Sequence, residues 1–391
     1  MTSWIAGVDT GVLELPLFTD QHRERVRTLG AWCAEHTALW ADRAPEVADK
    51  TVRATVRALA DHGVFARLDG GGDLREICLA RQVLAHTDDL ADHAYSIQAL
   101  SITPLLRHGD DAQRDRFLPG LASGELLGAF AVSELAAGSD VSAVGLRAER
   151  TPDGYVLTGG KAWVANGDIA DVITVLARTG EGPGVLGLST FLVPADTPGL
   201  RVADRVALTA PRPIAHLEFD GCHVPAANRL GAGGGGFAVV ADVLDRFRMT
   251  VGAAALGFAR RALDAALDRA AGRPIRRGTL LDLPTVRADI ADLEVRLAAA
   301  DLLVARAAWE ADSGSRGHRG FPRTSAMAKL LATETAQEAV DTAVQVFGAA
   351  GLVADSLPER LYRQIRSLRI YEGPSEIQRS IVAESLRPGR R

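Results

Sequence analysis

A carboxylate near the end of the chain has the surroundings expected of a general base. Glu372 lies within Tyr371-Glu372-Gly373, between an aromatic residue and a glycine. A helix is expected just beyond, with Ser375 as its N-cap and Gln378 at the third helical position, which is the spacing of a capping box. A carboxylate fixed in a turn suits proton abstraction. The alternative is a solvated turn residue, because most glutamates are exposed.

Two further stretches have the residue types of a ligand site. Ala129–Asp140 is rich in small residues, which let a ligand approach the backbone, and Ser133 and Ser139 offer hydroxyl groups. Gly159–Gly167 places Trp163 between glycines and an asparagine, a composition that suits an aromatic wall against a flat ligand. Taken separately, each stretch is also explained by a loop and a core aromatic residue.

Other kinds of chemistry have weaker support. The sequence contains neither a GxSxG nucleophile elbow nor an HExxH zinc motif. The polar stretch His86–His93 contains two histidines and three aspartates. We interpret it as a solvated face, because charge clusters are commonly surface features, and we assign no metal.

Composition indicates an ordinary globular protein. The 391 residues are 47% hydrophobic and 24% charged, with a net charge of −5, and they contain no basic block. We therefore expect no nucleic-acid partner and no membrane partner. The three cysteines are scattered and the N-terminus lacks a signal-peptide pattern, so we expect a reduced, cytoplasmic location.

Hydrophobic periodicity divides the chain into helical, β and helical parts. Apolar residues recur every three or four positions before residue 127. Short β-branched runs such as 172–176, separated by Gly, Pro and Asp, then predict an antiparallel barrel or sandwich. The long amphipathic segments that follow predict an antiparallel helix bundle. We expect an α+β protein with an all-α domain at 1–127, a β-domain at 128–238 and an α-bundle domain at 239–391.

Taken together, the three stretches resemble the signatures of the acyl-CoA dehydrogenase family, flavoproteins that desaturate acyl thioesters. The middle-domain signature resembles Ala131–Asp140 and Tyr155–Gly167. The C-terminal signature resembles Gln345–Gly348, Arg363 and Tyr371–Arg379. The resemblance covers nearly the whole chain, and its order matches the helical, β and helical parts.

The resemblance implies that FAD lies between the β-domain and the C-terminal four-helix domain, completed by a neighbouring subunit of a homotetramer or a dimer. It implies that Glu372 takes the α-proton while the β-hydride passes to the flavin. Cofactor contacts are implied for Phe130, Val132, Ser133, Ser139, Trp163, Val164, Ala165, Arg273, Gln345, Gly348, Ala349, Pro374 and Glu376. Substrate contacts are implied for Ser139, Asp245, Arg248, Tyr371 and Gly373.

Several positions leave alternatives open. Arg273 competes with Arg269, Arg276 and Arg277 for the role of the arginine that pairs with the neighbouring pyrophosphate. An alternative for Arg248 is a helix-surface salt bridge with Asp245, three residues earlier.

Other positions differ from the family pattern. Phe247 stands where some relatives carry the base, and it cannot act as one, which favours Glu372. Ala165 and Pro374 lack hydroxyl groups that the family usually has near the flavin.

The resemblance implies α,β-dehydrogenation of an acyl group on coenzyme A or on an acyl carrier protein. An electron-transferring flavoprotein, or another acceptor, would take the electrons. The arginine-rich character and the departures from the family pattern suggest a biosynthetic branch in secondary metabolism. A flavin oxidase or monooxygenase on the same fold is an alternative, and a non-catalytic protein that binds acyl carriers is a second.

Overall fold

The computed structural model describes residues 4–66, 68, 73–313 and 321–387. The chain forms two compact units. The helical unit comprises Met1–Thr37, Asp73–Asp92 and Asp245–Arg391, and the β-containing unit comprises Ala38–Gly72 and His93–Leu244. Two long helices, α5 (Asp89–His108) and α7 (Gly236–Gly272), contribute residues to both units.

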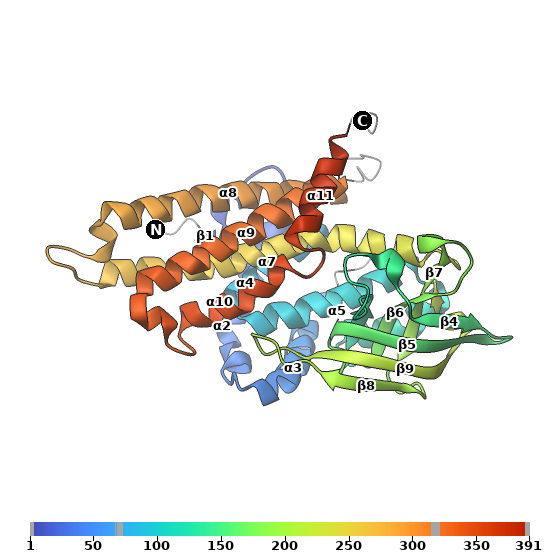
Figure 1. The fold of residues 1–391 in the computed structure, drawn as a ribbon. Helices are drawn as coiled ribbons and strands as arrows, with labels where there is room; N and C mark the ends of the chain where they lie inside the picture. The colour runs from blue at the N-terminus through green and yellow to red at the C-terminus, as the bar shows by residue number, and fades with distance from the viewer. Residues whose placement is uncertain (1–3, 67, 69–72, 314–320, 388–391) are drawn as a thin grey trace. The chain divides into compact units, whose positions relative to one another are not determined.

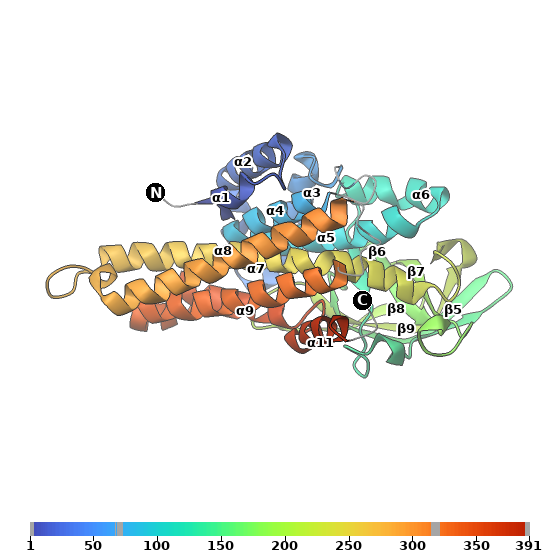
Figure 2. The same ribbon diagram turned by 90° about the horizontal axis from the view of Figure 1, so that it is seen from above.

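Long helices whose contacting faces carry many small residues form the helical unit. Its other elements are β1 Trp4–Ile5, β2 Val8–Asp9, α1 Thr10–Leu13, α2 Asp20–Glu35, α4 Leu74–Thr87, α8 Pro284–Asp312, α9 Phe321–Phe347, α10 Leu357–Ile365 and α11 Ser375–Ser385. Figures 1 and 2 both show α7, α8 and α9 running side by side. Glycine and alanine allow these helices to approach closely: a Cβ atom at Gly252 of α7 would lie 3.2 Å from the Ala328 carbonyl oxygen of α9.

A twisted sheet dominates the β-containing unit (Figure 1). Its elements are α3 Ala48–Asp61, α6 Asp111–Ala122, β3 Gly128–Ala131, β4 Arg147–Arg150, β5 Gly154–Ala165, β6 Val172–Arg178, β7 Leu188–Pro194, β8 Leu200–Arg205, β9 Ile214–Pro225 and β10 Arg229–Leu230. The strand order is β10-β7-β6-β4-β5-β9-β8, and β3 pairs with β6. Most pairs are antiparallel, but β3 and β4 each run parallel to β6. Helical parts and a mainly antiparallel sheet confirm the predicted fold class.

Hydrophobic patterning explains why these strands form a sheet. Alternate residues of β5 and β9, such as Leu157 and Phe219, are buried in one apolar cluster with Val175 of β6 and Phe191 of β7. The strands β6 and β7 are buried along almost their whole length, which accounts for their continuous β-branched and apolar runs.

The polar stretch His86–His93 is mostly buried, so its interpretation as a solvated face is wrong. The helix α5 begins within it, and Asp88, Asp89, Asp92 and His93 are all buried. Partners explain the burial: Asp92 forms an ion pair with Arg81, and the His93 side chain is hydrogen-bonded to an asparagine of its own unit. The sequence shows which residues are charged, but it does not show the partners that offset the cost of burying them.

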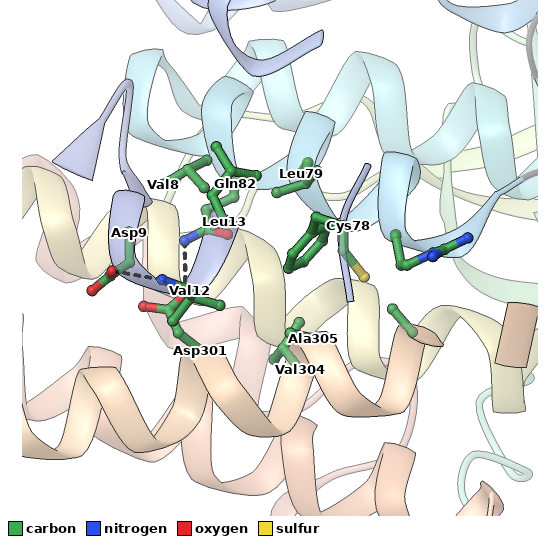
Figure 3. A pocket seen from close by; sticks show the side chains of 13 residues that line it. Val8, Asp9, Val12, Leu13, Cys78, Leu79, Gln82, Asp301, Val304 and Ala305 are labelled. Carbon is green, nitrogen blue, oxygen red and sulfur yellow. Dashed lines mark hydrogen bonds between the residues drawn. The ribbon is translucent and has the colours of Figure 1, made fainter. Parts of the chain in front are cut away.

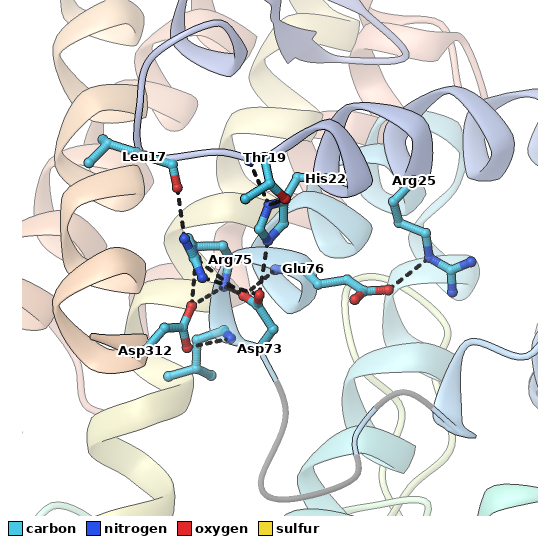
Figure 4. A network of polar contacts seen from close by, with 9 residues as sticks. Leu17, Thr19, His22, Arg25, Asp73, Arg75, Glu76 and Asp312 are labelled. Atoms are coloured by element: carbon cyan, nitrogen blue, oxygen red, sulfur yellow. Dashed lines mark hydrogen bonds and ion pairs between the residues drawn. The ribbon is translucent and has the colours of Figure 1, made fainter. Parts of the chain in front are cut away.

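A polar network joins α2, α4 and α8 within the helical unit (Figure 4). His22 contacts Asp73 at 3.0 Å, and the Arg75 Nε atom lies 2.9 Å from an Asp312 carboxylate oxygen. Asp312 also accepts a hydrogen bond from the Leu74 backbone N–H at 2.8 Å. Burial, together with the nearby Asp73 carboxylate, raises the pKa of Asp312 to about 6. These bonds hold the start of α4 against the end of α8.

A cavity of about 20 Å³ lies between the N-terminal segment, α4 and α8 (Figure 3). Val8, Leu13, Cys78 and Val304 are among its lining residues. Its volume is enough for about one water molecule and too small for an acyl chain. The residues that line it include none of those predicted to bind cofactor or substrate.

No helix within the described residues has the length and apolarity needed to cross a membrane.

Candidate active site

The turn that carries Glu372 has an unusual backbone conformation. Glu372 has a φ of 52° and Gly373 a φ of 88°, so two successive residues lie in the left-handed region. A non-glycine residue in that region costs roughly 1–3 kcal/mol and persists only where its surroundings hold it. The amide Nε2 of Gln378 donates to the carbonyl oxygens of Glu372 (3.2 Å) and Gly373 (2.8 Å). Lys329 Nζ of α9 also donates to the Gly373 carbonyl oxygen at 2.9 Å.

The predicted capping box at the start of α11 is wrong. Pro374 is the N-cap, and Ser375 is already the first helical residue. A capping box needs an N-cap backbone N–H for the third helical side chain to accept, and proline has none. The side chain of Gln378 instead holds the turn, and the Ser375 hydroxyl donates to Glu334 of α9 at 2.6 Å. Both polar side chains therefore fix the Glu372 turn.

The carboxylate of Glu372 faces inward. The residue as a whole is half-buried, but its Oε2 atom has almost no accessible surface and no hydrogen-bond partner among the described residues. Burial raises the pKa of Glu372 above its ordinary value, although the charges of Arg81, Lys329 and Arg248 oppose this rise. A carboxylate with a buried, unpaired oxygen and a raised pKa has the properties of a general base.

Sequence reasoning missed Lys329, which is fully buried in α9. Burial lowers the pKa of Lys329 to about 8, while the charge of Glu372 opposes this shift. The side chain therefore holds the turn through Gly373 and places positive charge near the base. The chain contains only three lysines, and an isolated lysine in the alanine-rich segment around 326–332 was the available signal.

Replacing Lys329 with methionine should move the acidic limb of the pH profile of kcat/KM to higher pH. The Lys329 charge lowers the pKa of Glu372, so its removal leaves the base protonated up to a higher pH. The turn also loses a hydrogen bond from a charged donor, worth about 1.5–3 kcal/mol. Steady-state rates measured across pH check both effects.

The exposed Lys50 of the β-containing unit provides the control, because Lys50→Met removes the same charge from a side chain that is not buried. A Lys329→Met profile that is lowered without a shift along the pH axis would show that Lys329 has only a structural role.

The predicted substrate residues Asp245 and Arg248 lie one turn apart on α7. They form an ion pair, so the salt bridge considered for them is present. It is not on the surface, because the Arg248 side chain is only 13% exposed and its Nε atom is buried without a hydrogen-bond partner. Phe247 between them is 1% exposed and apolar, so that position contributes no base.

A second group of predicted residues lies at the C-terminal ends of α7 and α9. Arg273, Gln345, Gly348 and Ala349 are exposed. The Arg269 guanidinium lies over the Phe347 ring at 5.6 Å, which places the two helix ends next to each other. Arg273, Gln345 and Gly348 therefore form an exposed edge of the helical unit. Glu376 is also exposed, but it lies elsewhere in the unit, in the first turn of α11.

The β-containing unit brings together several predicted cofactor residues at the ends of β3 and β5. Lys161 of β5 is buried, and its Nζ donates to the Val132 carbonyl oxygen (2.9 Å) and to Glu134 (2.8 Å). The Ala162 N–H donates to the Ser133 carbonyl oxygen at 2.8 Å. Burial lowers the pKa of Lys161 to about 8, while Glu134 opposes the shift. These bonds fix the backbone around Ser133.

Trp163 projects from a break in the β5–β9 ladder. The strand register shifts between Lys161 and Val164, and Trp163 has a φ of 59°. Its side chain is 54% exposed, so it is not the core aromatic residue of the alternative interpretation. The ring of His216 meets it edge-on, with centroids 4.8 Å apart.

The neighbours of Trp163 differ in what they can offer a ligand. Val164 is buried in the sheet core, while Ala165 is half-buried. Phe130 and Val132 are half-buried beside a second apolar cluster. Ser139 is exposed.

Comparisons with known proteins agree with this architecture. The acyl-CoA dehydrogenase N-terminal, middle and C-terminal domain families match residues 19–125, 129–222 and 234–387. The chain is 36% identical over 291 residues to the mitochondrial short-chain specific acyl-CoA dehydrogenase of Rattus norvegicus, covering 74% of this chain and 69% of that protein. The chain therefore belongs to the acyl-CoA dehydrogenase family, and the resemblance found in the sequence is confirmed.

Solved structures are similar over most of the chain. Butyryl-CoA dehydrogenase from Megasphaera elsdenii has a TM-score of 0.85 and 28% identity, covering 94% of this chain and 98% of that structure. The FAD complex of PigA has a TM-score of 0.85 and 25% identity, with the same coverage.

Proposed function

We propose that this protein catalyses the FAD-dependent α,β-dehydrogenation of a short acyl thioester, with Glu372 as the base that takes the α-proton. One observation supports this most directly. The Glu372 Oε2 atom is buried and unpaired on a turn held by Lys329 and Gln378. An inert turn glutamate would be solvated or paired with a cation.

Proton abstraction next to a thioester needs both a strong base and stabilisation of the enolate. Removing water from the Glu372 carboxylate increases its basicity, which is the direction in which burial moves its pKa. No acceptor within the described residues takes the Glu372 backbone N–H. That N–H would donate to the thioester carbonyl oxygen, where negative charge develops. The same residue would then position the substrate and remove its proton.

Residues of the β-containing unit fit FAD, the cofactor of the PigA complex. When bound, FAD supplies the acceptor for the hydride. The exposed Trp163 ring, with the half-buried Phe130 and Val132, offers apolar surface to a flat ring, and Ser133 adds a hydroxyl group. In a homo-oligomer the exposed Arg273 would bind the pyrophosphate of a neighbouring subunit's FAD, with Gln345 and Gly348 beside it.

The descriptions of the relatives favour a short acyl group. The rat protein is described as short-chain specific, and the Megasphaera protein acts as a butyryl-CoA dehydrogenase. The paired charges of Asp245 and Arg248 suit the polar pantetheine arm. Coenzyme A and an acyl carrier protein share that arm, so the carrier is decided by experiment. An electron-transferring flavoprotein would receive the electrons.

Anaerobic mixing of the purified protein with a panel of acyl thioesters tests this proposal. Each short acyl group is presented once on coenzyme A and once on an acyl carrier protein. The proposal predicts a yellow protein that loses its flavin colour while an enoyl thioester forms. A colourless protein that does not take up added FAD would support the non-catalytic alternative and overturn the proposal.

Ala165 is the specific observation that favours a second candidate function, an oxidase. It lacks the hydroxyl group that family members usually place near the flavin, which leaves the reactivity of the reduced cofactor open. Admitting oxygen after the anaerobic reaction separates the two. Rapid return of the colour with one hydrogen peroxide per enoyl product would identify an oxidase.

A further inference from the structure

A buried ion pair lies in the helical unit near Glu372. Arg81 of α4 and Asp92 in the first turn of α5 are 1% and 4% exposed. Arg81 Nε and Nη2 each donate to a different Asp92 oxygen at 2.8 Å. Arg81 Nη1 donates to the Thr250 hydroxyl of α7 at 3.0 Å. The pair therefore joins three helices in a region with almost no accessible surface.

The hydrogen-bonding capacity of this pair is not used up. A guanidinium has five N–H groups. The bonds to Asp92 and Thr250 use three of them, which leaves two N–H groups without an acceptor in the described part of the chain. Each Asp92 oxygen also keeps a lone pair after accepting from Arg81. The pair can therefore both donate to a further group and accept from it, while its net charge is zero.

Packing connects this pair to the Glu372 turn. Thr250 precedes Gly252, where α7 and α9 approach so closely that a Cβ atom would lie 3.2 Å from the Ala328 carbonyl oxygen. Lys329, which follows Ala328 in α9, donates from its Nζ atom to the Gly373 carbonyl oxygen. The charges of both Arg81 and Asp92 act on Glu372, in opposite directions. The pair therefore lies in the same packed region of the helical unit as the turn that carries the base.

A purely structural role explains this pair poorly. An apolar pair of similar volume is often as stable as a buried ion pair, or more stable, because two charges must be desolvated. Arg260, in the same unit, shows what a structural arginine looks like here: it contacts the three carboxylates of Asp9, Glu294 and Asp301. Arg81 contacts one carboxylate and one hydroxyl group, and it lies near the base.

We propose that the acyl group of the substrate carries a hydroxyl group, which binds to Arg81 and Asp92. A hydroxyl group accepts one hydrogen bond and donates another, which matches the unused N–H of Arg81 and lone pair of Asp92. The pair has no net charge, so a carboxylate or an ammonium group would lose its hydration there without a counter-charge of its own, whereas a neutral hydroxyl group would not. This inference rests on the proposed dehydrogenase function and names its substrate class as short hydroxyacyl thioesters.

The test compares thioesters that differ only in the acyl terminus. Anaerobic cofactor reduction is measured with γ-hydroxybutyryl-CoA and δ-hydroxyvaleryl-CoA against butyryl-CoA and valeryl-CoA. Succinyl-CoA and γ-aminobutyryl-CoA provide the charged comparisons. The quantity compared is the rate constant of cofactor reduction divided by the Kd of the thioester. Because a hydroxyl group would gain a hydrogen bond to a charged group, this ratio should be about tenfold or more higher for at least one hydroxyl thioester than for its apolar counterpart. Both charged thioesters should react more slowly than that hydroxyl thioester.

A double variant tests the residues themselves. Arg81→Met with Asp92→Leu removes both charges together and leaves neither partner unpaired. The hydroxyl preference should disappear while butyryl-CoA is still oxidised. The matched control is Gln82→Met, a buried polar residue on the same helix that bonds to Gly7 and Asp301 instead. It should keep the preference. Should the double variant not fold, the wild-type panel decides the question alone.

Binding measurements separate the two proposals. Calorimetric titration of the Glu372→Gln variant gives a Kd for each thioester without turnover. Tighter binding of a hydroxyl thioester without any oxidation by the wild type would support the hydroxyl site and overturn the dehydrogenase function. Oxidation of butyryl-CoA or succinyl-CoA at least as fast as both hydroxyl thioesters, or a preference kept by the double variant, would overturn the hydroxyl site.

Discussion

Replacing Glu372 with glutamine should lower the rate of anaerobic flavin reduction by acyl thioester about a thousandfold, within the range attributed to general base catalysis. The carboxamide has the same shape as the carboxylate but cannot take a proton. The buried Oε2 position then holds a neutral group, and the hydrogen bonds from Lys329 and Gln378 to the turn remain. FAD content and the unfolding temperature should therefore stay close to those of the wild type. Stopped-flow absorbance and the flavin-to-protein ratio measure both.

Glu384→Gln is the matched control. Glu384 lies on α11, half-buried and paired with Arg387 at 2.7 Å, and no role in the site is assigned to it. Its variant should reduce the flavin at the wild-type rate. Unchanged reduction in Glu372→Gln would assign the base to another residue. Loss of FAD from that variant would show that Glu372 acts on cofactor binding instead.

The second large effect is on stability: Gly257→Ala should destabilise the helical unit by about 2 kcal/mol or more, which is the cost of overpacking. A Cβ atom at Gly257 of α7 would lie 2.2 Å from the Gln82 carbonyl oxygen of α4 and 2.9 Å from the His86 backbone nitrogen. Both contacts are with backbone atoms, so no flexible side chain can move aside. Chemical denaturation measures the change in free energy of unfolding.

Gly272→Ala, at the end of the same helix, is the control, because its Cβ atom would meet nothing within 4 Å. Alanine there should leave stability unchanged or raise it slightly, as its helix propensity is higher by about 1 kcal/mol. Equal unfolding free energies for the two variants would mean that α4 and α7 do not pack as closely as described. Because α4 carries Arg81, Gly257→Ala should also lower activity.

Local sequence patterns were sufficient to predict the architecture and to single out the most distinctive candidate residues. The Tyr371-Glu372-Gly373 turn and the stretch around Trp163 contain unusual residues at fixed spacing, and these features remain visible without the fold. The runs at β6 and β7 are buried on both faces, and their short length and β-branched residues indicate strands.

The residues that shape the surroundings of Glu372 could not be predicted in the same way. Arg81 and Asp92 precede it by more than half the length of the chain, and only the packing of α4, α5 and α7 brings them near the turn. In the sequence a buried charge looks like a surface charge, which is why the stretch containing Asp92 was assigned to a solvated face. The predicted capping box does not form because Pro374, which has no backbone N–H, is the N-cap. The Gln378 side chain donates to the Glu372 carbonyl oxygen instead.

Isotope effects on anaerobic flavin reduction test the central claim most directly. Butyryl-CoA, or the hydroxyl thioester that reacts best, is prepared with deuterium at Cα or at Cβ. The account predicts a slower reaction in both cases, because Glu372 removes a proton from Cα while a hydride leaves Cβ, and it predicts that one enoyl thioester forms for each FAD reduced. Flavin reduction that is insensitive to deuterium at Cα, or that occurs without an enoyl product, would contradict it.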